Sequence, residues 1–266
     1  MTPLDYLTVA RCAGADAGEF LHAQLSADIA ALEPGDGTFA CCCSPRGQVI
    51  GLLLVYRQGD AYLVAASAEL LPGILTRLKM FVLRSSVEFS VLPDIGLYGI
   101  GAQEDTSSAS VFQPVGSNLR YLFSESAGEN NGGVEFFNEQ EIRNQVVWLG
   151  PKTTEKFIPQ MLGFDQIGAV SFSKGCYPGQ EIVARARYLG KVKRKPVVVH
   201  THEELLIEPA ERVELRREDN WSAGTVIDSV SAGGAGTVFF IVAPAEPETA
   251  PEELRYQDRS YRCATT

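Results

Sequence analysis

The feature that most restricts the fold of this 266-residue chain is a series of short β-type segments near its C-terminal end. The segments are residues 197–200, 212–216, 222–230, 236–242 and 255–263, and turn residues separate them. Short strands at regular spacing are typical of a small barrel or sandwich. The sequence therefore predicts a small β-barrel or sandwich over residues 196–266, after a boundary near Lys195 and Pro196. An acidic, proline-rich loop at 244–253 separates the last two expected strands.

The residues before this boundary mix helical and strand patterns. Strands are expected at 4–12, 38–43, 48–56, 61–66, 87–91 and 95–100. The longest helix is expected over 16–32, because Asp16 can cap it and Glu19 lies in its first turn. Further helices are expected after Ser67 and over 138–147. Residues 1–195 are therefore expected to contain both helices and strands.

Charge and hydropathy patterning exclude several classes of protein. The chain has 33 acidic and 23 basic residues, a net charge of −10, so direct nucleic-acid binding is not expected. The N-terminus lacks a basic segment followed by an apolar one, which argues against a secretory signal. The longest apolar run, 49–56, is too short to span a membrane. A cytoplasmic protein with reduced cysteines is therefore expected.

Cysteine and histidine spacing gives no sign of a metal site. The chain has six cysteines and three histidines, and no C-x-x-C pair. Cys41, Cys42 and Cys43 lie in an expected strand, where successive side chains point to opposite faces. They therefore cannot converge on one iron–sulfur cluster and are expected to pack in the core. His200 and His202 share a strand face, but no third ligand is evident.

Residues 172–187 (FSKGCYPGQEIVARAR) form the segment with the clearest chemical potential. Pro178 suits the first position of a helix that would run to about Tyr188. Cys176 would then precede a helix N-terminus and lie two residues from Lys174, and both features would lower the pKa of the thiol. Gly175 and Gly179 would let the backbone approach a ligand closely. The alternative is a packed cysteine in an ordinary loop-to-helix connection.

This segment resembles the signature of the YgfZ family, folate-binding proteins of iron–sulfur metabolism that are related to the aminomethyltransferase (T-protein) of the glycine cleavage system. The signature residues here are 174–181, KGCYPGQE. Further similarity lies at 157–160, 168–172, 183–187, 193–195, 14–16, 20–21, 24–28 and 221–226. The resemblance implies a T-protein-like folate-binding fold of two intertwined α+β subdomains within residues 1–195, followed by a C-terminal β-barrel. It also implies tetrahydrofolate as cofactor, held in a central channel.

Two departures from the superfamily pattern affect the expected chemistry. Aminomethyltransferases have an aspartate where this chain has Gly51 and Leu52, so aminomethyl transfer is not expected. The family glutamate associated with the pterin corresponds to Arg143, which has only hydrogen-bond donors and would suit the anionic folate tail instead. Phe137, just upstream, would offer a surface for ring stacking.

The resemblance and the motif together define the candidate site. Cys176 is the candidate reactive group, with Lys174 beside it. The expected cofactor-binding residues are Gly175, Tyr177, Gly179, Gln180, Glu181, Phe137, Arg143, Arg185 and Arg187. The last two belong to a run of six basic residues within 185–195, which is either a solvated face or an anion site for a polyglutamyl folate tail or RNA.

Three hypotheses about function follow. The first is a tetrahydrofolate-binding accessory protein that supports assembly or repair of iron–sulfur proteins, its expected partners, and the tRNA modification that depends on them. The second is a folate-dependent one-carbon transferase with a displaced catalytic carboxylate. The third is a docking module without chemistry, which would use the barrel and the basic run.

Overall fold

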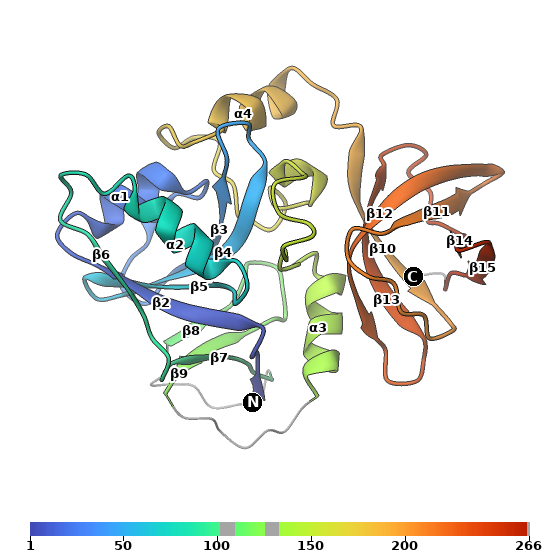
Figure 1. Cartoon of the computed structure of the whole chain (residues 1–266), viewed down its shortest axis with the longest axis horizontal. Helices are drawn as coiled ribbons and strands as arrows, with labels where there is room; N and C mark the ends of the chain where they lie inside the picture. The colour runs from blue at the N-terminus through green and yellow to red at the C-terminus, as the bar shows by residue number, and fades with distance from the viewer. Residues whose placement is uncertain (102–109, 126–132, 265–266) are drawn as a thin grey trace.

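The computed structural model describes residues 1–101, 110–125 and 133–264, and three antiparallel sheets organise this part of the chain (Figure 1). The first sheet has the order β3-β4-β5-β2-β6. Its strands are β2 (Leu7–Ala13), β3 (Gly37–Cys43), β4 (Val49–Gln58), β5 (Ala61–Ser67) and β6 (Glu88–Val91). The expected strands of the first 91 residues are confirmed to within a few residues.

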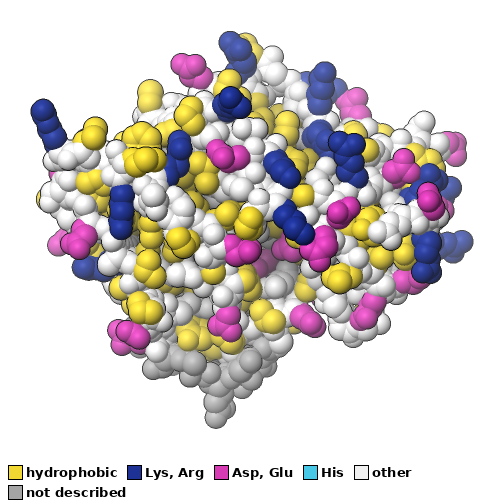
Figure 2. Space-filling model, in the orientation of Figure 1, with side chains coloured by type: hydrophobic (Ala, Val, Ile, Leu, Met, Phe, Trp, Pro, Cys, Tyr) yellow, Lys and Arg dark blue, Asp and Glu magenta, His cyan; other side chains and the backbone are white. Residues whose placement is uncertain are grey.

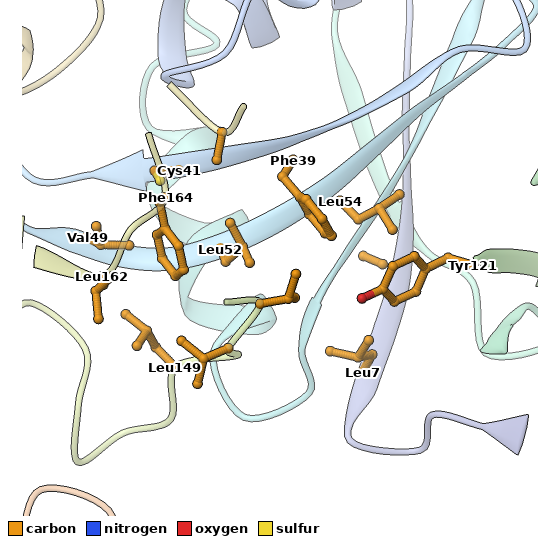
Figure 3. Close-up of a cluster of buried hydrophobic side chains, with 14 of the residues drawn as sticks. Leu7, Phe39, Cys41, Val49, Leu52, Leu54, Tyr121, Leu149, Leu162 and Phe164 are labelled. Carbon is orange, nitrogen blue, oxygen red and sulfur yellow. The ribbon is translucent and has the colours of Figure 1, made fainter. Parts of the chain in front are cut away.

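The second sheet contains strands from both sides of the first sheet in the sequence. Its order is β1-β7-β9-β8, formed by β1 (Thr2–Pro3), β7 (Gly96–Gly99), β8 (Ser110–Phe112) and β9 (Tyr121–Ser124). In the sequence, β1 comes before all strands of the first sheet and β7 comes after them. The two sheets are therefore interleaved along the chain. Their facing side chains form the largest apolar cluster, in which Phe39, Leu54 and Tyr121 point toward one another (Figure 3).

Four α-helices and two short 3-10 helices surround these sheets in the described residues. The α-helices are α1 (Ala17–Gln24), α2 (Leu71–Lys79), α3 (Val134–Arg143) and α4 (Gln180–Tyr188). The 3-10 helices are η1 (Ile29–Ala31) and η2 (Pro159–Met161). Figure 1 places α3 between the two interleaved sheets and the C-terminal sheet, while α4 lies above the β3–β4 hairpin.

The prediction of one long helix over 16–32 is wrong. The helix ends at Gln24, because Leu25 is extended and pairs with Cys42 of β3. The Ser26 hydroxyl accepts a hydrogen bond from the Cys41 N–H at 2.8 Å, which continues this contact with the strand. Asp16 also makes no capping bond to α1, since its carboxylate accepts instead from the Ser86 N–H at 2.6 Å.

The three consecutive cysteines lie as expected. Cys41 and Cys43 belong to the apolar cluster between the two interleaved sheets, whereas Cys42 packs on the other face, against α1 and α2. All three are buried. Among the described residues, no group of three or more His, Cys, Asp or Glu side chains is arranged to hold a metal ion.

The C-terminal sheet has six strands in the order β10-β13-β12-β11-β14-β15. They are β10 (Arg194–Thr201), β11 (Arg212–Arg217), β12 (Asn220–Ser231), β13 (Thr237–Pro244), β14 (Glu253–Tyr256) and β15 (Arg259–Arg262). The last expected strand is a hairpin, β14–β15. The closed barrel is not confirmed, since β10 and β15 form no ladder in the described part of the chain. Their edges meet there at an isolated bridge between Thr201 and Cys263.

The C-terminal sheet shares its core with the rest of the molecule. Val238, Phe240 and Val242 of β13 belong to the same apolar cluster as Leu149 and Phe164. The opposite face of the sheet has its own cluster around Leu215 and Phe239. In the described parts of the chain, no helix combines the length and the apolar character needed to cross a membrane.

Candidate functional site

A cavity of about 510 Å³ lies where the interleaved sheets, α3 and the C-terminal sheet meet. Six separate segments contribute to its wall, so it forms only when residues from the first strand to the C-terminal sheet have folded together. The lining residues are Asp5, Tyr6, Ser67, Ala68, Glu69, Asn138, Glu141, Trp148, Leu149, Gly150, Pro209, Ile227 and Asp228. In Figure 2, acidic side chains gather in the middle of the face where the two halves of the molecule adjoin.

Glu141 is the most strongly bound side chain in this wall. Its Oε1 accepts hydrogen bonds from the Tyr121 hydroxyl at 2.8 Å and the Trp148 indole N–H at 2.9 Å. Its Oε2 accepts from the Tyr6 hydroxyl at 2.7 Å. Burial raises the pKa of Glu141 to about 7, although the three donors oppose that rise. The site therefore holds a carboxylate, fixed in orientation, that changes charge near neutral pH.

Asp228 and Asn138 add two further acceptors to the cavity wall. Asp228 lies at an irregularity in the β12–β13 ladder and accepts a hydrogen bond from the Ser229 N–H at 2.8 Å. Burial raises the pKa of Asp228 to about 6. The Oδ1 atom of Asn138 is buried and has no hydrogen-bond partner in the described structure. A buried acceptor without a donor is costly, which suggests a ligand that supplies one.

The cavity wall is consequently rich in acceptors and in negative charge. Asp5 and Glu69 are exposed at its rim, and the lining set given above contains no Lys, Arg or His. Such a wall suits a ligand with several N–H donors and disfavours an anionic group inside the cavity. Trp148 and Ile227 provide apolar surface beside the acceptors.

The segment around Cys176 lies on a different part of the fold. Cys176 is exposed, whereas Lys174 is buried and its ammonium donates to the backbone carbonyls of His22 and Leu25, the latter at 2.6 Å. These carbonyls lie at the end of α1, so the lysine acts as a cation at a helix C-terminus. Burial lowers the pKa of Lys174 to about 8, and interactions with Asp28 and, to a smaller extent, Cys176 partly offset this.

The start of α4 differs in detail from the expectation. The helix begins at Gln180 and its N-cap is Gly179 in the left-handed region (φ 83°), so Pro178 lies outside the helix and not at its first position. A Cβ on Gly179 would approach the Ser44 carbonyl oxygen to 2.4 Å. The glycine therefore allows α4 to pack directly on the turn between β3 and β4.

The other expected cofactor-binding residues do not come together around the cavity. Tyr177 is buried beneath Lys174, whose ammonium lies 5.1 Å from the ring centre. Gln180 is half-buried, and Gly175 and Glu181 are exposed. Phe137 packs in the core, edge-on to Tyr121. Arg143 is exposed and paired with Glu139 at 2.8 Å, one helical turn away. None of these residues lines the cavity.

The basic run 185–195 is partly neutralised by the acidic loop that follows β13. Lys191 forms an ion pair with Glu246, and Lys195 with Glu248 at 3.3 Å. The Arg187 guanidinium lies 4.1 Å from the ring centre of Phe172, and Arg185 is exposed on α4. Lys and Arg side chains gather on the upper part of the face in Figure 2, around α4 and the segment that leads to β10.

The position of the aminomethyltransferase aspartate holds no acid and faces the core. Leu52 is buried in the main apolar cluster. Gly51 faces α2, since a Cβ there would lie 2.8 Å from the side chain of Ile74. The carboxylates of the cavity therefore come from other elements, and sequence reasoning missed both Glu141 and Asp228. The available signal was an acid, Glu141, one helical turn from Phe137 and next to Ile142.

Comparison with known proteins gives both sequence relatives and a structural match. No family model matches the chain. An uncharacterized protein of Haemophilus influenzae is 30% identical over 227 residues, which are 83% of this chain and 81% of that protein. The tRNA-modifying proteins YgfZ of Escherichia coli O7:K1 and Shigella boydii serotype 4 are 26% identical over 272 residues, covering 90% of this chain and 83% of each relative.

The aminomethyltransferase T of the glycine cleavage system from Bartonella henselae has a similar structure. The TM-score is 0.75, with 15% sequence identity, and the match covers 98% of this chain and 83% of that chain. At this identity the match establishes the T-protein fold and not the activity.

Proposed function

The chain belongs to the YgfZ family, and on this premise we propose that it binds tetrahydrofolate in the cavity beside α3. We further propose that it acts in the cytoplasm as an accessory protein for the assembly or repair of iron–sulfur proteins and for tRNA modification that depends on them. The T-protein fold and the YgfZ relatives support a folate-related role in tRNA modification. The observation that carries the proposal is the set of acceptors at Glu141, Asp228 and Asn138.

The chemistry of a reduced pterin matches this wall. A tetrahydropterin ring presents an amino group and several ring N–H groups, all of which are donors. Glu141 would accept from such donors through the remaining lone pairs of its carboxylate, and Asn138 Oδ1 would gain the donor that it lacks. Trp148 would pack against the ring. When bound, the cofactor would supply a carrier for one-carbon units.

The folate tail would have to leave the cavity. Its carboxylates are anionic, and Asp5 and Glu69 at the rim would repel them. Arg143 is held by Glu139 on the exposed side of α3 and would meet the tail only outside the cavity. A tail directed toward solvent leaves room for polyglutamyl chains of different lengths.

A fluorescence titration tests folate binding at this site. The chain has two tryptophans, Trp148 in the cavity and Trp221 on β12. Tetrahydrofolate should quench Trp148 saturably in a Trp221→Phe background. Glu141→Gln should weaken binding about tenfold or more, since it replaces an acceptor oxygen by a donor.

Two further variants on α3 change residues outside the cavity lining, one as a control and one as a test of the folate tail. Glu139→Gln removes a charge two residues from Glu141, and it should leave the dissociation constant within about twofold. Arg143→Glu tests whether the arginine contributes to holding the tail. No saturable quenching in the protein with Trp148 intact would contradict folate as the cofactor.

Cys176 is proposed as the group that meets client proteins. Its thiol is exposed on the loop before α4, two residues after the buried Lys174. Cells that lack the protein would be complemented with Cys176→Ala, and the activity of an iron–sulfur tRNA-modifying enzyme would be measured. Loss of that activity with unchanged folate binding is expected. Full activity would favour a docking module instead.

A one-carbon transferase remains the second candidate, and Asp228 is the observation that favours it. The carboxylate lies in the cavity with its pKa raised to about 6, which suits proton transfer near neutral pH. Release of formaldehyde from an aminomethyl donor, dependent on tetrahydrofolate and lost in Asp228→Asn, would support this activity.

A further inference from the structure

A second pocket, separate from the cavity, contains a buried arginine without a carboxylate partner. Arg217 ends β11, where Val213 and Leu215 point into the apolar core of the C-terminal sheet. The alternation of the strand places Arg217 on the same inward side, and it is only 3% exposed. Inward-facing positions of this strand otherwise hold apolar side chains. Arginine is rarely buried at such a position, so its presence here needs a physical explanation.

The surroundings of Arg217 leave its charge uncompensated. One of its Nη atoms donates to the Pro244 carbonyl at 3.2 Å, while its Nε is buried and has no hydrogen-bond partner in the described structure. No ion pair joins it to an acid among the described residues. Arginine stays protonated in proteins, so burial here leaves a positive charge without an anion.

The neighbouring Arg216 shows the contrast. It lies on the opposite face of the same strand and pairs with Glu252 at 3.2 Å and with Glu253 at 2.8 Å. Within the described residues, carboxylates thus pair with the more accessible arginine and none pairs with the buried one. The two arginines are neighbours on β11, so their position along the strand does not explain why only one of them has carboxylate partners.

Arg217 faces a hollow of about 380 Å³ between the start of β10 and the loop after β13. Lys195 adds a second cation to the wall, and its partner Glu248 is exposed, so this pair can open at little cost. Pro196, Pro247 and Pro251 contribute apolar surface. The volume is in the range of small-molecule sites.

We infer that this pocket binds a small organic molecule with an oxyanion, a phosphate or a carboxylate, attached to an apolar or aromatic body. The unpaired edge of the Arg217 guanidinium would hold two oxygens of that group, which is the arrangement that arginine forms with both phosphate and carboxylate. Lys195 would leave Glu248 and add a second contact. The proline-rich wall would pack against the body of the ligand.

Calorimetric titration of the full-length protein with three probes tests this inference. The probes are inorganic phosphate, adenosine 5′-monophosphate and benzoate, which separate the anion from the body and phosphate from carboxylate. At least one of the two organic probes should bind saturably and about tenfold or more tightly than phosphate. Arg217→Met should abolish this binding, and Lys195→Met should weaken it severalfold.

Arg216→Met is the matched control, since it removes the same charge from the opposite face of the strand. It should leave the affinity within about twofold. Equal losses in the two arginine variants would show a general charge effect and overturn the inference. So would the absence of saturable binding of any probe to the wild-type protein.

Thermal unfolding without ligand separates a binding role from a structural one. Replacement of an uncompensated buried cation by methionine should leave the melting temperature unchanged or raise it. A lower melting temperature together with unchanged probe binding would assign Arg217 a purely structural role. If Arg217→Met does not fold, Arg217→Lys keeps the charge but loses the two-pronged geometry, and its affinity should fall while Lys195→Met still reports on the pocket.

Discussion

At the scale of single residues, the titratable groups that matter most in the cavity are Glu141 on α3 and Asp228 on β12. Glu141 receives three hydrogen bonds, from Tyr6, Tyr121 and Trp148, and these keep its carboxylate in one orientation. Arg143, two residues later on the same helix, is turned by about 200° and lies in solvent. The sequence singled out position 143 by resemblance. A two-residue offset on a helix decides which side chain enters the cavity, and it is visible only in three dimensions.

The raised pKa values of Glu141 and Asp228 predict how stability depends on pH. Folding raises the pKa of Glu141 from 4.5 to about 7, so the folded state retains a proton that the unfolded state loses. Stability should therefore fall as pH rises from 4.5 to 7, by on the order of 3 kcal/mol for this group. Asp228 acts in the same direction between 3.8 and about 6.

Denaturant unfolding of wild type, Glu141→Gln and Asp228→Asn at pH 4.5, 6 and 8 measures this effect. The difference in unfolding free energy between wild type and each variant should shift in favour of the variant as pH rises. A difference that is constant across the range would contradict the assignment of these carboxyls as the titrating groups.

Lys174 and Cys176 are predicted to have separable roles although they belong to one motif. Lys174→Met removes a buried ammonium that two carbonyls at the end of α1 accept from, which should cost about 2 kcal/mol of stability. Cys176→Ala changes an exposed side chain and should stay within about 0.5 kcal/mol of wild type. Urea unfolding of both variants measures this; equal losses would mean that the thiol also packs in the fold.

At the scale of elements, local patterns predicted strands better than helix ends. The β3–β4 hairpin follows from turn residues 44–47 between two apolar runs, and both strands formed where expected. The first helix ended eight residues early because Leu25 pairs with β3, which a periodic apolar pattern does not reveal. The cap of α4 likewise depends on contact with a distant turn.

The packing of α4 on the β3–β4 turn predicts a strong effect at Gly179. Gly179→Ala would combine a positive φ of 83° with a Cβ that is 2.4 Å from the Ser44 carbonyl oxygen. The loss of stability should be about 2–4 kcal/mol. Gly35→Ala is the matched control, since its φ is 98° but its Cβ would have no atom within 4 Å.

The control should lose only the conformational cost, about 1–2 kcal/mol. The two variants are compared by chemical denaturation monitored through circular dichroism. Similar losses would indicate that α4 moves away from the turn easily, and the segment before it would then be less fixed than the contacts suggest.

At the scale of the whole molecule, the interleaved sheets follow from the family resemblance and not from local pattern. No periodicity in residues 1–125 indicates that β1 pairs with β7. The paired residues, Thr2 with Gly99 and Pro3 with Tyr98, lie 97 and 95 positions apart along the chain. The acidic loop and the basic run were each visible in the sequence, but their pairing through Lys191 and Lys195 was not. The strand pattern near the C-terminal end indicated the antiparallel sheet that forms there, whereas the closed barrel that was expected is not confirmed.

The shared core and the cavity together predict that the molecule unfolds in one step and that tetrahydrofolate shifts this step. Residues 1–195 and 196–266 are predicted to be separate regions of the chain. However, β13 packs in the same apolar cluster as Phe164, so the unfolding of the two regions should be coupled.

A ligand in the cavity would contact both α3 and Asp228 on β12. At one hundred times its dissociation constant it should add about 2.7 kcal/mol. Calorimetry should therefore show one transition that moves up by roughly 5–10 °C, with a much smaller shift in Asp228→Asn. Two transitions, of which only one moves, would instead place the ligand within a single region.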